Sequence, residues 1–277
     1  MKYESEVKDY FKNKADRYDL VNNQPYWKLS DKLLWNTFGE NLLSTLPNKF
    51  RFLDAGGGTG RWSMKILEAY NEARGTLFDL SEDMLGVANK KLVNSLEKRL
   101  NLVKGDLHNM DSIENESYDI AFNFHNVLGF VKNPKEVINQ ISSKLKKDAY
   151  LVSFVPNKYH NIFFNVFVNN LDEAEIAAKT DDGRFTSDMP YMRLFTPNSI
   201  KNLYESAGLK VESLKGFPIS IYPGMQETQI SGSSEKVLEL LENKKNFQRI
   251  YNIEKILYEN ESAASRGNNI YIIGQKH

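Results

Sequence analysis

The chain has 277 residues with 36 basic and 36 acidic side chains, so its formal charge is zero and its isoelectric point is about 6.9. A hydrophobic content of 41% supports a large buried core, and the neutral charge gives no overall attraction to phosphate backbones. The lack of cysteine excludes disulfides, thiolate metal sites and a cysteine nucleophile, and the four histidines have spacings that match no familiar metal motif.

Residues 1–49 are expected to form a helical segment with many aromatic side chains, among them Tyr10, Tyr18, Tyr26 and Trp27. These aromatics are either the buried face of the helices or contacts to a ligand that the segment covers. Charged residues in the first turns interrupt the apolar core that a secretory signal needs, and residues 162–168 are too few to cross a bilayer. We therefore expect a cytoplasmic protein with no membrane partner.

A glycine-rich turn follows the apolar run at residues 50–53 and precedes a helical pattern. Glycines lack a Cβ atom, so the turn can adopt positive φ and let a ligand lie against its backbone beside a helix N-terminus. A dinucleotide-binding turn needs glycine where Arg61 stands, and its pyrophosphate has no use for the acid at Asp54. The turn therefore favours a nucleoside ligand that carries positive charge.

Three further strands are expected to end in polar residues at the same sheet edge. Asp79 ends residues 75–79 about twenty residues beyond the turn, where a carboxylate can accept both ribose hydroxyls. Asp106 ends residues 101–105, and residues 118–124 run into His125. Ser81 is the expected N-cap of a helix whose apolar positions 85, 88, 92 and 96 share one face. A fifth strand at residues 150–155 is expected to stop at Pro156.

The pattern Asp-x-Gly-x-Gly-x-Gly, with these strand ends, resembles the class I S-adenosylmethionine-dependent methyltransferases, whose cofactor carries an ammonium and a sulfonium but no phosphate. The resemblance covers roughly residues 50–155. Residues 53–58 and 124–128 are most similar to small-molecule methyltransferases and to the bacterial methyltransferase that esterifies carboxymethoxyuridine in transfer RNA. The resemblance implies an α/β Rossmann-like sheet, mostly parallel, with helices on both faces, a helical N-terminal segment and cap insertions.

The same resemblance implies a set of cofactor contacts. Asp106 would accept from the adenine amine while the backbone of Leu107 meets a ring nitrogen, and Met84 would lie over the adenine unless it is core. Tyr18 matches a tyrosine that contacts the methionine end of the cofactor. The full expected set is Tyr18, Asp54, Gly56, Gly58, Gly60, Asp79, Leu80, Met84, Asp106, Leu107, Phe124 and His125.

The chain divides into four expected parts. Residues 1–49 cover the cofactor, residues 50–156 form the α/β core, residues 157–195 form a substrate cap, and residues 196–277 complete the core with a helical insertion at 216–268. Thr196 and Pro197 predict a helix start, Gly208 its end, and residues 209–214 and 270–273 two more strands. The amphipathic helices of the insertion predict either core packing or a dimer surface.

Methyl transfer from a sulfonium is an in-line displacement in which positioning supplies much of the rate. A general base is needed only where the nucleophile still holds its proton, and His125 and His160 are the candidates. The candidate substrate contacts are Tyr10, Tyr26, Trp27, Tyr191, Arg184 and Arg193. Either arginine would pair with a carboxylate or phosphate, unless it is a solvated surface residue.

The resulting prediction is an S-adenosylmethionine-dependent O- or N-methyltransferase that acts on a small molecule, as a monomer or homodimer. A transfer RNA wobble-base methyltransferase is the alternative, although the neutral charge does not favour nucleic acid. An NAD-dependent oxidoreductase and a non-catalytic cofactor-binding protein are retained from other classes.

Overall fold

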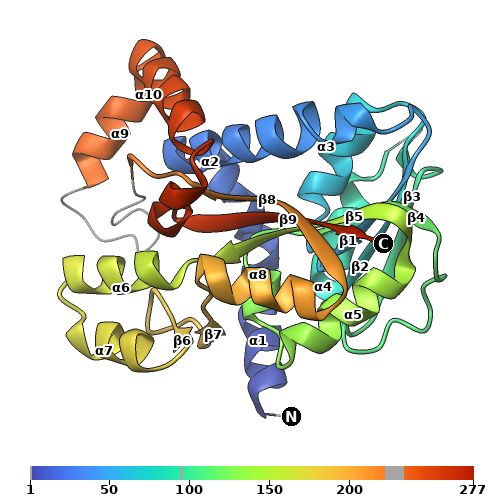
Figure 1. The fold of residues 1–277 in the computed structure, drawn as a ribbon, viewed down its shortest axis with the longest axis horizontal. Coiled ribbons are helices and arrows are strands. Elements are labelled where there is room, and N and C mark those ends of the chain that lie inside the picture. The colour runs from blue at the N-terminus through green and yellow to red at the C-terminus, as the bar shows by residue number, and fades with distance from the viewer. Residues whose placement is uncertain (1, 94–95, 222–233) are drawn as a thin grey trace.

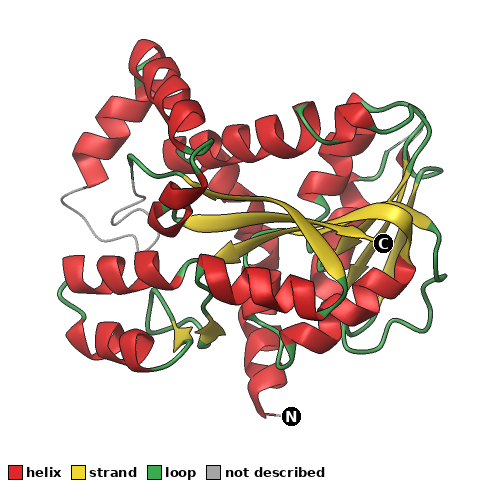
Figure 2. Ribbon diagram, viewed as in Figure 1, coloured by secondary structure: helices red, strands yellow, loops and turns green. Residues whose placement is uncertain are grey.

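The computed structural model describes residues 2–93, 96–221 and 234–277, which build a seven-stranded sheet between two layers of helices (Figures 1 and 2). The strand order is β3-β2-β1-β4-β5-β9-β8, and β9 runs antiparallel to both of its neighbours. The strands are β1 (Arg51–Ala55), β2 (Arg74–Asp79), β3 (Leu100–Lys104), β4 (Tyr118–Asn123), β5 (Leu145–Pro156), β8 (Leu209–Phe217) and β9 (Asn269–Lys276). The predicted Rossmann-like fold class is confirmed.

Helices cover both faces because the central parallel strands are apolar on both sides. Phe52 of β1 packs with α2 (Pro25–Trp35) and α3 (Arg61–Ala69) on one face. Its neighbour Leu53 packs with α5 (Pro134–Lys144) and α8 (Pro197–Ser206) on the other. Figure 1 shows these two helix pairs on opposite sides of the sheet.

The N-terminal segment is helical, as predicted. It contains α1 (Lys2–Lys14), a 3₁₀ stretch (Ala15–Asn23), α2, a π-helical turn (Asn36–Glu40) and a short 3₁₀ turn (Leu43–Thr45). Among the described residues, none of the helices combines the length and apolarity that spanning a membrane requires.

The polar caps that the sequence indicated define several helix starts. The Ser81 hydroxyl accepts from the Met84 N–H at 3.3 Å, and Thr196 forms a capping box with Ser199 at the start of α8. The helix after Ser81 is shorter than predicted: α4 (Glu82–Lys91) ends where Leu92 adopts extended geometry, so position 96 lies beyond it.

The fifth strand also differs from its prediction, because β5 begins at Leu145 and includes Pro156. A proline is tolerated there because it is the last residue of the strand, where the missing N–H does not interrupt the ladder, and its carbonyl accepts from the Phe195 N–H at 2.9 Å. The strand predicted at 209–214 extends to Phe217, and the last strand lies between β5 and β8.

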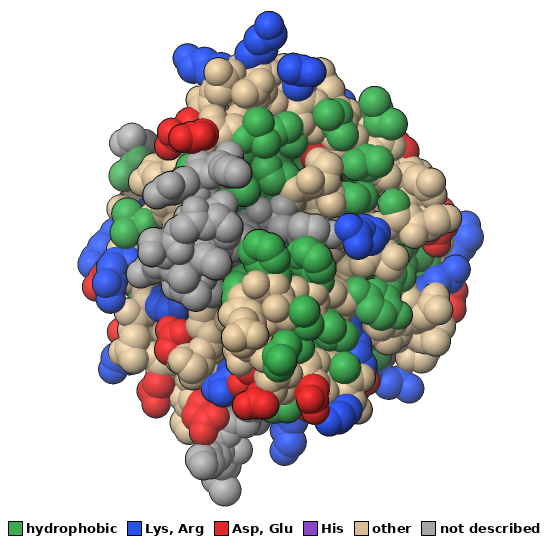
Figure 3. Space-filling model, turned by 90° about the vertical axis from the view of Figure 1, so that its left-hand side faces the viewer, with side chains coloured by type: hydrophobic (Ala, Val, Ile, Leu, Met, Phe, Trp, Pro, Cys, Tyr) green, Lys and Arg blue, Asp and Glu red, His purple; other side chains and the backbone are tan. Residues whose placement is uncertain are grey.

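Residues 157–195 form a small helical layer with a core of its own. It contains α6 (Lys158–Phe167), α7 (Leu171–Lys179) and a two-stranded ribbon of β6 (Asp182–Gly183) and β7 (Met192–Arg193). Phe164, Phe185 and Met192 are buried in this core. The outer face of α6 exposes Tyr159, Phe163, Val166 and Phe167, and Figure 3 shows hydrophobic side chains spread over this side of the molecule.

The insertion predicted at 216–268 contains the two expected helices, α9 (Ser234–Glu242) and α10 (Lys244–Leu257), while its residues 222–233 lie outside the described part. Glu254 of α10 is fully buried. Its carboxylate accepts from the backbone N–H groups of Ile219 at 2.7 Å and Ser220 at 2.6 Å, and from the Ser220 hydroxyl at 2.6 Å. These bonds join α10 to the chain that leaves β8.

Replacing Glu254 by glutamine is expected to lower the free energy of unfolding by about 3 kcal/mol, because an amide NH₂ would face donors that are buried away from water. Urea unfolding of the two proteins measures the difference. The matched control is Glu259→Gln, since Glu259 is 61% exposed and its ion pair with Lys215 is worth less than about 1 kcal/mol. Equal losses in both variants would contradict the structural role of Glu254.

Candidate functional site

A cavity lies at the carboxyl ends of β1, β2, β3 and β4, beside the point where the strand order reverses between β1 and β4. It holds about 1150 Å³ of empty space including its mouth, enough for a nucleoside with its substituents. Of the twelve predicted cofactor contacts, all except Gly60 line it. The lining also includes residues that the sequence analysis did not select: Val7, Lys8, Phe11, Gly57, Thr59, Arg61, Trp62, Ser81, His108, Val127, Phe130, Val131 and Lys132.

The glycines of the turn serve different purposes. Gly56 has φ +82°, and a Cβ atom on it would lie 2.7 Å from Val127, so this glycine is required for packing. Gly58 has φ +54° and faces open space, with the Met84 sulfur 4.0 Å from where a Cβ atom would stand. Gly60 has φ +74° and packs between Leu77 and α4 at the start of α3, which explains its absence from the cavity lining.

Asp79 connects the end of β2 to the glycine turn. One carboxylate oxygen accepts from the Gly58 N–H at 2.8 Å, and the other accepts from the Ser81 N–H at 2.8 Å. Burial raises the pKa of Asp79, and the backbone hydrogen bonds oppose that rise. A carboxylate has about four lone-pair sites, so Asp79 can still accept hydrogen bonds from a ligand.

Asp54 is a buried acid beneath the turn. Its side chain is 3% exposed and accepts from the Ser63 hydroxyl at 2.6 Å. Burial raises the pKa of Asp54 to about 7, with a further contribution from Asp79. A Cβ atom on Gly57 would lie 2.5 Å from the Asp54 carboxyl carbon, so only glycine leaves this acid room at the cavity wall.

Arg61 and His125 meet inside the cavity. The Arg61 Nη1 donates to Asp31 and Asn22, each at 2.6 Å, and its Nη2 donates to the His125 Nε2 at 2.6 Å. The Trp62 Nε1 donates to the same imidazole nitrogen at 2.8 Å. Because Nε2 accepts from both groups, the proton of His125 resides on Nδ1. Burial, and then the charge of Arg61, hold the pKa of His125 well below its usual value, so the ring is neutral.

His125 reaches this position through an uncommon backbone. His125 has φ +54° and Asn126 has φ +72°, two consecutive left-handed residues that are not glycine. Such geometry costs on the order of 1–3 kcal/mol per residue and persists only where neighbours enforce it. The Asn269 amide of β9 donates to the Asn126 side chain at 2.7 Å, and the Asn126 N–H donates to the Phe154 carbonyl at 3.1 Å.

Asp106 at the end of β3 is paired with the second histidine of the cavity. It accepts from the backbone N–H and the ring Nδ1 of His108, at 2.9 and 2.8 Å. Burial alone would raise the pKa of Asp106, but these bonds lower it. The His108 Nε2 accepts from the Asn133 N–H at 3.3 Å, so both imidazoles of the cavity have their lone pair in use.

The N-terminal segment is attached across the glycine turn. Asp19 accepts from the Thr59 hydroxyl at 2.7 Å and forms an ion pair with Lys91 of α4. From α1, the Phe11 ring meets the Phe130 ring edge-on, with centroids 5.2 Å apart. The segment therefore contributes to the cavity wall, through Val7, Lys8, Phe11 and Tyr18.

Several predicted substrate or catalytic residues do not line the cavity. His160 is 3% exposed between the Phe164 and Phe185 rings, and burial lowers its pKa to about 3, so it is neutral. Tyr26 is fully buried and accepts from the Asn268 amide at 2.7 Å. Trp27 packs edge-on against it in the main core, 5.2 Å between centroids.

The other candidates do not line the cavity either, and each has an acid or an aromatic ring as its neighbour. The Glu173 carboxylate accepts from the Arg184 Nε at 2.8 Å and from the Tyr191 hydroxyl at 3.1 Å. Arg193 pairs with Asp181 at 3.4 Å. Tyr10 lies beside the cavity, with its ring 6.5 Å from that of Phe130. Helical spacing of aromatics does not distinguish such core and surface positions from ligand contacts.

Comparison with known proteins decides between the nucleotide-binding alternatives. A family model described as a methyltransferase domain matches residues 28–214, more than half of the chain. The chain belongs to this family. The predicted class I methyltransferase, with S-adenosylmethionine as methyl donor, is thereby confirmed over the oxidoreductase and non-catalytic alternatives.

Relatives of this methyltransferase differ in the acceptors that their names state. A tRNA 5-carboxymethoxyuridine methyltransferase of Escherichia coli O157:H7 is 27% identical over 198 residues, which cover 68% of this chain and 70% of the relative. A ubiquinone/menaquinone biosynthesis C-methyltransferase of Rhodopseudomonas palustris is 30% identical over 130 residues, 44% of this chain and 49% of the relative. A crystal structure from Thermotoga maritima, described as a possible histamine N-methyltransferase, has a TM-score of 0.58 at 17% identity and covers 98% of this chain and all of that one.

The cavity suits the cofactor on structural grounds. Its wall combines a buried acid beside bare glycine backbone, a second acid at the expected ribose position, and rings from Tyr18, Trp62 and Phe124. Acids suit an ammonium and ribose hydroxyls, and aromatic faces suit a sulfonium.

Proposed function

We propose that this methyltransferase acts on an oxygen or nitrogen atom of a small molecule. The observation that carries the proposal is the cavity itself, which residues of α1 and Phe130 line together with the glycine turn, and in which Phe11 packs against Phe130. Such a cavity suits an acceptor that enters it as a whole. Residues 157–195 would form the acceptor side, since Phe130 lines the cavity and packs against their core.

S-adenosylmethionine supplies a methyl group on a positively charged sulfur. In this proposal the Asp79 carboxylate accepts hydrogen bonds from the ribose hydroxyls, and the Asp54 carboxylate accepts them from the ammonium. Asp106 and the Leu107 backbone bind the adenine. Phe11 and Tyr18 exclude water from the reacting end.

His125 is assigned an orienting role in this proposal, since its acceptor nitrogen already receives two hydrogen bonds. The Tyr18 hydroxyl stays protonated because burial raises its pKa. The acceptor would therefore arrive with its lone pair available or lose its proton to water.

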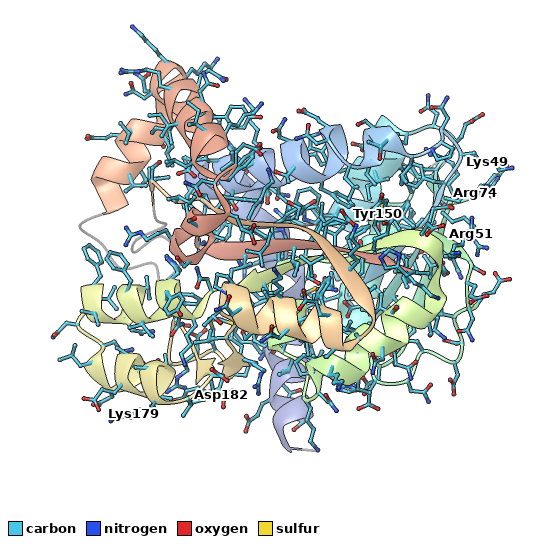
Figure 4. All side chains as sticks on the ribbon, viewed as in Figure 1. Lys49, Arg51, Arg74, Tyr150, Lys179 and Asp182 are labelled. Carbon is cyan, nitrogen blue, oxygen red and sulfur yellow. The ribbon has the colours of Figure 1, made fainter. Side chains whose placement is uncertain are left out.

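A transfer assay with radiolabelled S-adenosylmethionine tests the proposal. Small metabolites and total transfer RNA from one extract are presented separately, and label is expected in the small-molecule fraction. Label confined to RNA would instead support a transfer RNA methyltransferase, the second candidate, which the relative at 27% identity favours. Figure 4 labels Lys49, Arg51 and Arg74, among other residues. These three cationic residues lie by the amino ends of β1 and β2, whereas the cavity lies at the carboxyl ends of the strands.

The pKa of Asp54 predicts how cofactor binding depends on pH. Only the ionised acid attracts an ammonium, so affinity for S-adenosylhomocysteine is expected to rise about eightfold between about pH 6 and about pH 7.5. The stability of the unliganded protein depends on pH in the opposite direction. Because the folded state raises the pKa of Asp54, this residue stabilises the fold fully below about pH 4, and the contribution is lost as the pH rises to about 7.

Calorimetry at the two pH values measures the effect, with Asp54→Asn as the matched variant. The variant is expected to bind more weakly and with a flat pH dependence. A wild-type affinity that does not change with pH would contradict the assigned contact between Asp54 and the ammonium.

A further inference from the structure

Arg61 is the first residue of α3, directly after the glycine turn, and its side chain lines the cavity although only 14% of it is exposed. The methionine tail of the cofactor carries a carboxylate as well as an ammonium. The acids Asp54, Asp79 and Asp106 suit the ammonium, the ribose and the adenine, but a carboxylate requires a cation. Arg61 follows the turn as Asp54 precedes it, so the two ends of the turn carry opposite charges.

The guanidinium of Arg61 has donors left for a ligand. Arginine carries five N–H donors, and three are used within the described residues: two on Nη1, toward Asp31 and Asn22, and one on Nη2, toward His125. The Nε–H and the second Nη2–H remain. Two donors are the number that a carboxylate takes in a bidentate pair.

The partners of Arg61 fix its orientation before any ligand binds. Asp31 and Asn22 hold it from the N-terminal segment, and His125 holds it from the end of β4 through an imidazole that can only accept at Nε2. A preorganised donor loses little entropy on binding. The positive end of α3, a helix of nine residues, adds to the attraction for an anion.

We infer that Arg61 anchors the carboxylate of the cofactor's methionine tail, an assignment that rests on the proposed cofactor site. Asp31 and His125 act as positioning residues for the guanidinium. The N-terminal segment thereby takes part in binding the tail, because Asp31 and Asn22 belong to it.

The test compares two ligands that differ only in this carboxylate: S-adenosylhomocysteine and its decarboxylated analogue, S-adenosyl-3-thiopropylamine. Calorimetry on the wild-type protein is expected to show about 30-fold tighter binding of the first. In Arg61→Gln this ratio is expected to fall to near one, because the variant loses the carboxylate contact but not the nucleoside contacts. A purely structural role for Arg61 would weaken both ligands equally and leave the ratio unchanged, which would overturn the inference.

Two further variants complete the design. Lys65→Gln is the matched control, since Lys65 lies in α3 near Asp31 but does not line the cavity, and it is expected to keep the wild-type ratio. Arg61→Lys retains the charge without the two-pronged geometry and is expected to give a ratio of about 5, so it provides the test if Arg61→Gln does not fold. A wild-type protein that binds neither S-adenosylhomocysteine nor 5′-methylthioadenosine would overturn the proposed cofactor site together with this assignment.

Discussion

Replacing Asp79 by asparagine is expected to weaken S-adenosylhomocysteine binding several hundred-fold. The carboxylate would provide two charge-assisted hydrogen bonds to the ribose hydroxyls, each worth about 1.5–3 kcal/mol where water is excluded. The amide also places an NH₂ group opposite the N–H of either Gly58 or Ser81, which now donate to the two carboxylate oxygens at 2.8 Å. The substitution therefore removes ligand contacts and disturbs the glycine turn.

Calorimetry with S-adenosylhomocysteine measures this loss, and Asp83→Asn is its control. Asp83 lies four residues further along, in the exposed first turn of α4, and does not line the cavity. Its substitution therefore removes the same charge as Asp79→Asn without removing a cavity residue. Its affinity is expected to stay within about twofold of the wild type. Should Asp79→Asn bind as tightly as the control, the ribose would not lie at the end of β2.

The residues that line the cofactor cavity could be predicted from the sequence because many of them occupy the ends of successive strands. Parallel strands place their carboxyl ends at one edge, so Asp54, Asp79 and Asp106 were expected to converge, and all three line the cavity. Their contacts with the cofactor remain predictions. The glycines were equally readable, since a turn against a ligand requires positive φ, which Gly56 and Gly58 show.

The remainder of the cavity depends on contacts between distant parts of the chain. Phe11 meets Phe130, and Arg61 meets His125, across more than sixty residues in each case. No local pattern distinguishes such a pair from ordinary core. The position of β9 between β5 and β8 is likewise decided by tertiary packing, because a buried strand has the same apolar pattern at any place in a sheet.

The same limit applies to the candidate substrate and catalytic residues that do not line the cavity. His160 and Tyr26 belong to helical aromatic patterns that suit a ligand cap and a buried helix face equally. The sequence pattern gave no partner for Arg184, yet in the fold it forms an ion pair with Glu173 of α7. The sequence alone does not show which charged residues the fold pairs with one another.

Gly58→Leu is expected to reduce S-adenosylhomocysteine affinity more than a hundred-fold while costing only about 1–2 kcal/mol of stability. The stability cost is the strain of a side chain at φ +54°. Little clash with the protein adds to it, because a Cβ atom would have only the Met84 sulfur within 4.0 Å. The leucine would instead occupy the space beside Asp79 in which the cofactor is proposed to lie.

Gly208→Leu separates this loss of binding space from backbone strain. Gly208 has φ +76° after α8, has no other atom within 4 Å of an added Cβ, and does not line the cavity. Both leucines therefore carry the same kind of strain, and urea unfolding is expected to show similar losses of stability. Only Gly58→Leu should lose affinity by calorimetry, because only there does the open space belong to the ligand. If both variants bound S-adenosylhomocysteine alike, the space above Gly58 would be solvent rather than a cofactor site, and the bare turn would serve packing alone.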